Sequence, residues 1–207
     1  MKDKICLITG GSQGIGKVTA LELAKIGATV VIVCRNRQRG ETAVAEIKSA
    51  TGNNAVSLQL ADLAEQAEIR QLAADFGAKY QRLDVLINNA GFIARERTLT
   101  QDGIEPTFAV NHLAPFLLTN LLLPLLKASA PARVVNVASQ AHSQTLDFDN
   151  LQGEKSFEGI APYKQAKLAN ILFTFELARR LAGTGVVANC LHPGVIRSQL
   201  LDDFDYM

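Results

Sequence analysis

The chain has 207 residues and a mass of 22.3 kDa, which suits one globular domain. Apolar residues make up 48% and charged residues 20% of the sequence, a balance that excludes an intrinsically disordered chain. Lysine and arginine total 21 against 20 aspartate and glutamate. Since a net charge of +1 gives no basic field that would hold nucleic acid or an anionic membrane, we expect neither partner.

Two apolar segments decide whether a targeting signal is expected. The first, Ile5–Ile8, is shorter than the core of a secretory signal. The second, Phe116–Leu126, is interrupted by Thr119, Asn120 and Pro124, so we expect no membrane span and no membrane anchor. Three cysteines lie in apolar runs without metal-type spacing, which indicates reduced thiols, no metal site and a cytoplasmic location. They are Cys6, Cys34 and Cys190.

Short apolar runs alternate with longer segments of helical periodicity in chain order. The runs lack polar alternation, as expected for strands covered on both faces. They are Ile5–Ile8, Thr29–Val33, Val56–Leu60, Val85–Ile87, Val134–Val137 and Val186–Leu191. The helical segments are Ile15–Lys25, Arg39–Ser49, Glu65–Lys79, Thr107–Lys127 and Tyr163–Leu181. In the last helix one buried stripe is predicted from Leu168, Ile171, Leu172, Phe175 and Leu177.

This alternation predicts right-handed βαβ units and therefore an α/β fold. We expect a single doubly wound Rossmann domain over residues 1–207, with a parallel sheet of about six strands in the order 3-2-1-4-5-6. Residues 4–91 would form the cofactor half and residues 92–198 the catalytic half. Ligands of such sheets bind at the carboxyl ends of the strands, near strands one and four.

A glycine-rich turn, Thr9–Gly16, joins the first strand to the first helix. Gly10, Gly14 and Gly16 permit the turn, the approach of a pyrophosphate to backbone N–H groups, and tight helix packing. Strand, turn, helix and second strand follow in the right order, which predicts nucleotide binding. The turn lacks the Gly-Lys-Ser/Thr ending of a P-loop, which argues against an ATPase.

The second and third strands end in residues that bear on the type of dinucleotide. Arg35 stands where an NAD site usually carries a carboxylate, and its fork of donors suits a 2′-phosphate. The alternative is a solvated surface arginine. Asp62 follows the third strand and either accepts a hydrogen bond from an adenine amino group or caps the helix that begins near Glu65. The sequence thus favours NADP(H) over NAD(H).

Five further residues suggest a catalytic site at the same sheet edge. Tyr163 and Lys167 are four apart on one helix face, and a nearby ammonium favours the phenolate of a tyrosine. Ser139 lies just past the fifth strand, where its hydroxyl can bind a reacting oxygen. Asn89 ends the fourth strand and either braces the crevice or touches a ribose. Asn111 either holds a water near Lys167 or is a satisfied buried amide.

These residues together resemble the short-chain dehydrogenase/reductase family from about Lys4 to Ser198. Thr9–Gly16 is similar to the family's cofactor turn, and Asn88–Gly91 to its central motif. The resemblance implies a catalytic tetrad of Asn111, Ser139, Tyr163 and Lys167. It implies cofactor contacts at Gly10, Ser12, Gln13, Gly14, Ile15, Gly16, Arg35, Asp62, Leu63, Asn89, Ala90, Gly91, Tyr163, Lys167, Pro193 and Gly194.

Narrower stretches resemble the retinol dehydrogenase-like branch, which also includes the oxidoreductase part of WW-domain oxidoreductases. They are Asn111–Thr119, Asn150–Glu154, Lys167–Asn170 and Leu191–Val195. This resemblance implies an NADP-dependent oxidoreductase that moves a hydride between nicotinamide and an apolar aldehyde, ketone or alcohol. Tyr163 would be the general acid/base, Ser139 would polarise the oxygen, and Lys167 would tune Tyr163 and bind ribose. It also implies a homodimer through the two long helices.

The C-terminal end departs from the family pattern. Only 13 residues follow Gly194, so the last strand and helix of the family are expected to be absent. The alternative function is then a non-catalytic NADP-binding sensor or interaction module. Other polar residues are expected to be peripheral: His112, His142 and His192 as structural or pocket-lining groups, with His142 nearest the substrate, and Arg95 and Arg97 as a solvated loop or a pocket wall.

Overall fold

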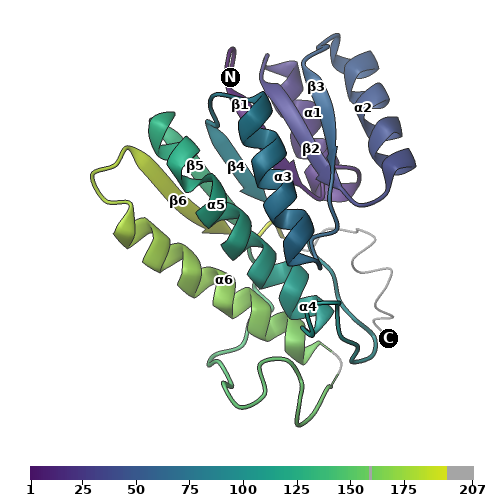
Figure 1. Ribbon diagram of the computed structural model, residues 1–207, viewed down its shortest axis with the longest axis vertical. Coiled ribbons are helices and arrows are strands. Elements are labelled where there is room, and N and C mark those ends of the chain that lie inside the picture. Colours follow the sequence, from purple (N-terminus) through teal and green to yellow (C-terminus); the bar gives the residue numbers. More distant parts are fainter. Residues whose placement is uncertain (159, 195–207) are drawn as a thin grey trace.

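Six parallel strands form one sheet in the predicted order, β3-β2-β1-β4-β5-β6 (Figure 1). The computed structural model describes residues 1–158 and 160–194. The register places Leu7 of β1 opposite Val31 of β2 on one side and Leu86 of β4 on the other. The strands are β1 Ile5–Thr9, β2 Thr29–Cys34, β3 Val56–Leu60, β4 Val85–Asn88, β5 Ala132–Val137 and β6 Val186–Leu191.

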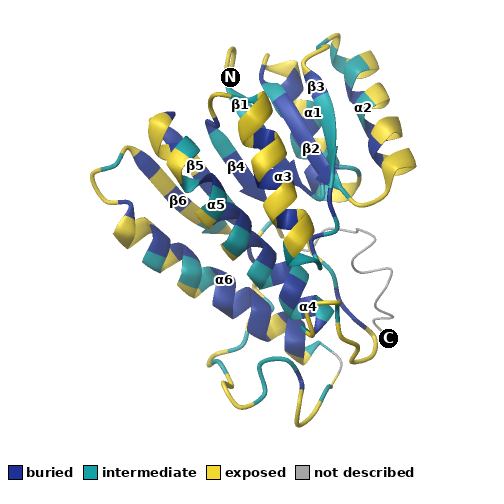
Figure 2. Cartoon of the chain, viewed as in Figure 1, coloured by how far each residue is buried: buried dark blue, intermediate teal, exposed yellow. Residues whose placement is uncertain are grey.

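Helices cover both faces of this sheet, as a strand without polar alternation requires. Cys6 and Ile8 face α1 and α2, whereas Leu7 between them faces the layer of α3, α5 and α6. Figure 2 shows strands that are largely buried and helices whose outward faces are exposed. The helices are α1 Gly14–Lys25, α2 Arg37–Thr51, α3 Gln66–Lys79, α4 Pro106–Phe108, α5 Ala114–Ala128 and α6 Ala161–Arg180, with a π-helix, η1, over Ala109–Leu113.

The segments α4, η1 and α5 follow one another without a break, so one helix occupies the region predicted for Thr107–Lys127. Its start has a clear local cause. The carboxylate of Glu105 accepts hydrogen bonds from the N–H groups of Thr107 and Phe108, each at 2.8 Å, and Pro106 has the fixed φ that suits a first helical residue. The π-helical turn within this helix was not predicted.

This helix, Pro106–Ala128, is long and apolar enough to cross a membrane when length and composition alone are considered. By that criterion, the expectation that Thr119, Asn120 and Pro124 exclude a membrane span is wrong. In the fold, α5 packs against α3 and the sheet, and Leu118 enters the core. Buried core helices of soluble proteins meet the same criterion.

The predicted buried stripe of α6 is only partly correct. Leu168 and Leu177 are buried, but Leu172 and Phe175 are 47% and 66% exposed. The helix buries a different face, one that includes the polar side chains of Lys167, Asn170 and Thr174. Periodicity missed this face because buried amides and hydroxyls do not register as apolar residues.

Within the described residues β6 is an edge of the sheet, and its Val187 and Leu191 are exposed. Residues 195–207 follow it and lie outside the described residues. The expected absence of the family's last strand and helix therefore lies outside the described residues. The same holds for residues 195–198, the end of the predicted catalytic half.

At the amino ends of the strands, opposite the predicted crevice, Asp84 is a buried carboxylate, 2% exposed. It accepts hydrogen bonds from Lys4 Nζ at 2.9 Å, from the Ile5 N–H at 2.9 Å and from Arg82 Nε at 3.0 Å. Burial raises the pKa of the Asp84 carboxyl, but these bonds outweigh burial and hold that pKa below its ordinary value. The cluster joins the start of β1 to the start of β4.

We expect Asp84→Asn to lower the free energy of unfolding at pH 7 by about 2–3 kcal/mol, because the amide leaves two cations without their carboxylate. A carboxyl group whose pKa is lowered by folding stabilises the fold above its unfolded pKa, near ~4. That stabilisation is lost as the pH falls through the lower folded pKa, so wild type and variant should converge in acid. Urea unfolding at pH 7 and below pH 4 measures this. Asp75→Asn, an exposed control, should unfold like wild type at both values.

Candidate active site

One cleft of about 1490 Å³ lies along the carboxyl ends of the strands. It is larger than the ~300–1,000 Å³ typical of a pocket for one drug-sized ligand, so it has room for a dinucleotide with a substrate beside it. The cleft brings together every predicted site residue except Gly16 and Asn111. Those that line it are Gly10, Ser12, Gln13, Gly14, Ile15, Arg35, Asp62, Leu63, Asn89, Ala90, Gly91, Ser139, Tyr163, Lys167, Pro193 and Gly194.

The glycine turn has no space for a side chain at Gly10, Gly11 or Gly16. Gly10 has a φ of +65°, and a Cβ there would lie 2.9 Å from the Cα of Ala90. A Cβ on Gly16 would strike the carbonyl of Gly10 and the amide of Asn89, which explains why Gly16 lies behind the cleft and does not line it. Helix α1 then begins at Gly14 without a side-chain cap and without an acidic residue in its first turn. Its N–H groups therefore favour an anion such as a pyrophosphate.

Asn89 braces this turn, which was one of the two roles left open for it. Its side-chain Nδ2 donates to the carbonyl of Thr9 at 2.9 Å. In return, Thr9 Oγ1 accepts the N–H groups of Asn89 and Ala90, at 3.0 and 3.1 Å. Thr9 was predicted only as the first residue of the turn, and its bracing role was not, although a hydroxyl at the end of an apolar strand is a recognisable signal. The bonds lock the ends of β1 and β4 together beneath the cleft.

The end of the cleft near β2 and β3 carries the residues predicted for the adenosine side. Arg35 is 72% exposed, and its guanidinium lies 3.9 Å from the carboxylate of Asp62. Asp62 does not cap α3, as one alternative held: its Oδ1 accepts the N–H of Ala64 at 2.9 Å, and the N-cap position is Glu65. Arg39 also lines the cleft and adds a second cation that the sequence analysis missed.

The predicted acid–base pair lies at the other end of the cleft. Lys167 Nζ lies 5.3 Å from the centre of the Tyr163 ring, and both residues are buried, at 3% and 7% exposure. The ammonium donates to the carbonyl of Val137 at 2.8 Å, and burial lowers the pKa of Lys167 to about 8. Ser139 Oγ accepts the N–H of Ala141 at 3.0 Å, so its own proton remains to be donated elsewhere.

Asn111 stands behind this pair and does not line the cleft. Both polar groups of its side chain are hydrogen-bonded within the protein. Oδ1 accepts the N–H of Phe92 at 3.2 Å, and Nδ2 donates to the carbonyls of Phe92 at 2.5 Å and Thr107 at 2.7 Å. Of the two roles considered, the structure therefore supports the satisfied buried amide. Asn111 ties the loop after β4 to the helix that contains η1.

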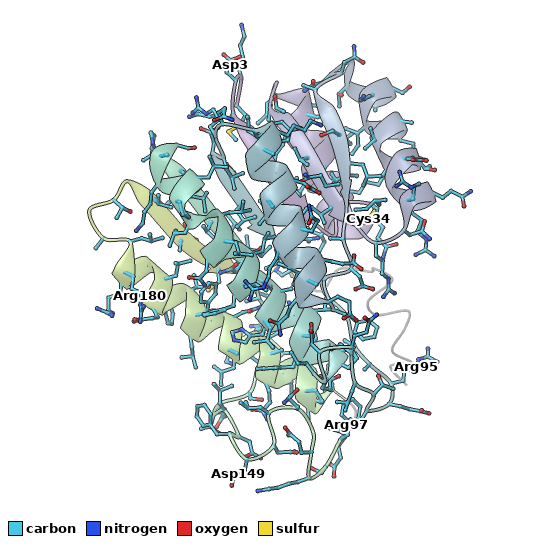
Figure 3. All side chains as sticks on the ribbon, viewed as in Figure 1. Asp3, Cys34, Arg95, Arg97, Asp149 and Arg180 are labelled. Atoms are coloured by element: carbon cyan, nitrogen blue, oxygen red, sulfur yellow. The ribbon has the colours of Figure 1, made fainter. Side chains whose placement is uncertain are left out.

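Of the polar residues outside the tetrad, His142 lies differently from the expectation, while Arg95 and Arg97 lie in the solvated loop that was one of the two alternatives for them. His142 is exposed and does not line the cleft, whereas His192 does. Arg95 and Arg97 lie in an exposed loop away from the cleft lining, and Arg97 donates to the carbonyl of Gln152 (Figure 3). Among residues 1–158 and 160–194, no group of three histidine, cysteine or acidic side chains could hold a metal ion.

The sequence analysis also missed the apolar wall near Tyr163. This part of the cleft is lined by Phe92, Ile93, Val110 and Ile160. Cys34, half-buried and reduced, lines the cleft at the β2 end (Figure 3). Isolated apolar side chains in loops, or in a helix such as η1, give no pattern that separates a pocket wall from the core, so no sequence signal identifies these residues.

Fold and site together define a doubly wound α/β domain of the Rossmann type, with a cleft along the carboxyl ends of its strands that ends at a tyrosine–lysine pair. A family model described as short chain dehydrogenase matches residues 4–206, and the chain belongs to that family. Its members bind a nicotinamide cofactor. Both the predicted fold class and the predicted family are confirmed.

Similar proteins place the chain in the retinol dehydrogenase-like branch. It is 48% identical to human retinol dehydrogenase 11 over 205 residues, which covers 99% of this chain and 64% of that protein. It is 50% identical to mouse retinol dehydrogenase 12 over 198 residues, covering 95% of this chain and 63% of that protein. The chain thus spans less than two thirds of the length of these curated relatives.

Solved structures of similar fold include two complexes with NADP. One is the Pseudomonas aeruginosa RhlG/NADP active-site complex, at 32% identity and a TM-score of 0.79, covering 98% of this chain and 77% of that one. The other is a short chain dehydrogenase from Burkholderia cenocepacia in complex with NADP, at 30% identity and a TM-score of 0.79. The match covers 96% of this chain and 77% of that one.

Proposed function

We propose that this protein is an NADP-dependent oxidoreductase that interconverts an apolar aldehyde or ketone and the matching alcohol. The observation that carries the proposal is the arrangement of one cleft: a glycine turn and helix N-terminus at one part, and Ser139, Tyr163 and Lys167 at another. Similarity to retinol dehydrogenases supports an alcohol or aldehyde as the substrate class.

The residues present fit a nicotinamide dinucleotide. Gly10 lines the cleft with a φ of +65°, which favours glycine, and the uncapped N-terminus of α1 suits the charge of a pyrophosphate. When bound, the cofactor supplies or accepts the hydride. Tyr163 gives its proton to the oxygen of the forming alcohol, or takes it in the reverse direction. Ser139 donates a hydrogen bond to the same oxygen, and Lys167 holds positive charge beneath Tyr163.

The cleft near Tyr163 supports an apolar substrate. Phe92, Ile93, Val110 and Ile160 contribute apolar surface to the cleft that Tyr163 also lines. An aldehyde with a long hydrocarbon part would bury that part against this surface, which stabilises the complex through the hydrophobic effect.

Consumption of NADPH with a series of apolar aldehydes and ketones tests the proposal. We expect absorbance at the nicotinamide band to fall only when chain, NADPH and carbonyl compound are all present. Tight binding of NADPH without turnover of any member of the series would contradict the enzyme and favour the alternative, an NADP-binding sensor or interaction module.

Arg35 is proposed to select NADP over NAD by pairing with the 2′-phosphate. We expect Arg35→Glu to weaken NADPH binding by about 30- to 100-fold, since a charged hydrogen bond is lost and a like charge is introduced. NADH binding should change by less than about threefold. Calorimetric titration with both cofactors measures this. Arg37→Glu makes the same charge change just outside the cleft and should leave the NADPH/NADH ratio near that of wild type.

We also propose that two copies of the chain associate through α5 and α6. Phe116 on α5 is 46% exposed, and Leu172 and Phe175 on α6 are exposed as well. The rings of Phe116 and Phe173 lie 5.2 Å apart, so the exposed apolar groups of the two helices are neighbours. Apolar surface of this kind is typical of protein interfaces.

A further inference from the structure

A buried chain of hydrogen bonds runs behind the cleft, from α6 across β5 to β4. Thr174 Oγ1 donates to the carbonyl of Asn170 at 2.7 Å and accepts from Asn136 Nδ2 at 2.8 Å. Asn136 Oδ1 in turn accepts from Asn88 Nδ2 at 2.8 Å. All four residues are at most 3% exposed. Since buried polar groups are costly unless they are paired, this chain stabilises the packing of α6 on the sheet.

Only the backbone carbonyl of Asn170 takes part in that chain, and its side chain points to a different element. Asn170 Nδ2 donates to the backbone carbonyl of Asn111 at 2.6 Å. Its Oδ1 lies 3.0 Å from His112 Nδ1. Because only the NH₂ group of an amide can donate to a carbonyl, Oδ1 must accept, and His112 must carry its proton on Nδ1. The side chain of Asn170 thus binds two consecutive residues of η1.

The carbonyl of Asn111 needs such a donor for a local reason. In an α-helix its partner would be the N–H of the residue four positions on, but that residue is Pro115, which has none. The helix responds with a π turn, in which the N–H of Ala114 bonds to the carbonyl of Ala109, five residues back. Asn170 supplies a donor from the neighbouring helix in place of the missing N–H.

This contact connects the two sides of the candidate active site. On one side, the Asn111 side chain holds the backbone of Phe92, which lines the cleft directly after Gly91. On the other side, Asn170 lies one helical turn after Lys167 on α6. The Asn170–Asn111 bond is therefore a direct link between the wall formed by Phe92 and the helix that carries the proton donor.

We propose that Asn170 is a positioning residue, which sets the distance between the Gly91–Phe92 wall of the cleft and the Tyr163–Lys167 pair by holding the carbonyl of Asn111. The inference rests on the proposed oxidoreductase function. Asn170 touches neither cofactor nor substrate. A shift of about 1 Å in this distance would misalign hydride donor and proton donor, and displacements of that size cost up to ~10²-fold in rate.

Two variants of Asn170 test this link. Asn170→Asp keeps the size and the acceptor for His112 but loses the donor to Asn111. Asn170→Leu has a side chain of similar size and removes both hydrogen bonds. It tests the same link if the buried aspartate of the first variant prevents folding. For each we expect kcat to fall about tenfold to hundredfold, with the Kd of NADPH within about twofold of wild type.

Thr174→Val is the matched control, because it breaks the buried chain one turn further along α6 without touching η1. It should lower the midpoint of urea unfolding and leave kcat within about twofold of wild type. Equal losses of kcat in Thr174→Val and the Asn170 variants would show a merely structural role and overturn the proposal. So would an Asn170 variant with the kcat of wild type.

A second measurement separates this inference from the proposed function. Nitrogen-15 NMR of histidine in the 207-residue chain should show His112 with its proton on Nδ1, and Asn170→Leu should shift the proton toward Nε2. A wild-type chain that binds NADPH but has no turnover would contradict the oxidoreductase function only. A wild-type His112 protonated on Nε2 alone would overturn the Asn170 link, whatever the activity.

Discussion

Tyr163→Phe is expected to lower turnover by about 10³-fold while NADPH binding stays within about twofold of wild type. The change removes one oxygen atom and keeps the ring, which is 7% exposed and lies over the ammonium of Lys167. General acid catalysis typically contributes 10²–10⁴-fold, and the variant loses its donor to the forming alcohol. Stopped-flow absorbance of NADPH with the best aldehyde of the series measures the rate, and calorimetry measures binding.

Tyr80→Phe is the control for the loss of a hydrogen-bonded, half-buried tyrosine hydroxyl. Tyr80 OH lies 3.0 Å from Ser57 Oγ, far along the sheet from the acid–base pair, and does not line the cleft. It should keep the turnover of wild type. A Tyr163→Phe variant that retains more than a tenth of wild-type kcat would contradict the assignment of Tyr163 as the proton donor, and a loss of NADPH binding would indicate a structural defect.

The parts of the site that follow from local spacing could be predicted from the sequence. Gly10 and Gly16 act within one turn, and Tyr163 and Lys167 share a helix face through a spacing of four residues, so neither requires knowledge of the fold. The end of a predicted strand was also enough to place Ser139, because parallel strands end at one edge of the sheet.

The parts that depend on a distant partner could not be predicted. Asn111 was identified as important, but its contacts with Phe92 and Asn170 come from segments 19 and 59 residues away. The exposure of Leu172 and Phe175 follows from the polar face that α6 buries, and the π turn follows from Pro115 together with a donor on another helix. Asp62 was ambiguous because an aspartate before a helix has the same appearance whether it caps the helix or forms a short turn.

Lys167→Met is expected to lower NADPH affinity by about 10- to 100-fold and to lower turnover further, because it removes the ammonium proposed to bind ribose and to favour the charged form of Tyr163. Methionine has similar length and no charge, so the buried space stays filled. Lys164→Met is the control on the same helix: Lys164 is exposed and lies outside the cleft, and it should bind NADPH like wild type.

The pH dependence of binding gives the sharper version of this prediction. Burial lowers the pKa of Lys167 from its ordinary value of 10.5 to about 8. Below pH 7 the side chain is charged, and between pH 7 and 9.5 it loses that charge, so the Kd of NADPH should rise across this window in wild type. It should rise in the same way in Tyr163→Phe, where no phenol can titrate, and stay flat in Lys167→Met. A wild-type Kd that does not change between pH 7 and 9.5, or a slope retained in Lys167→Met, would show that the charge of Lys167 does not hold the cofactor.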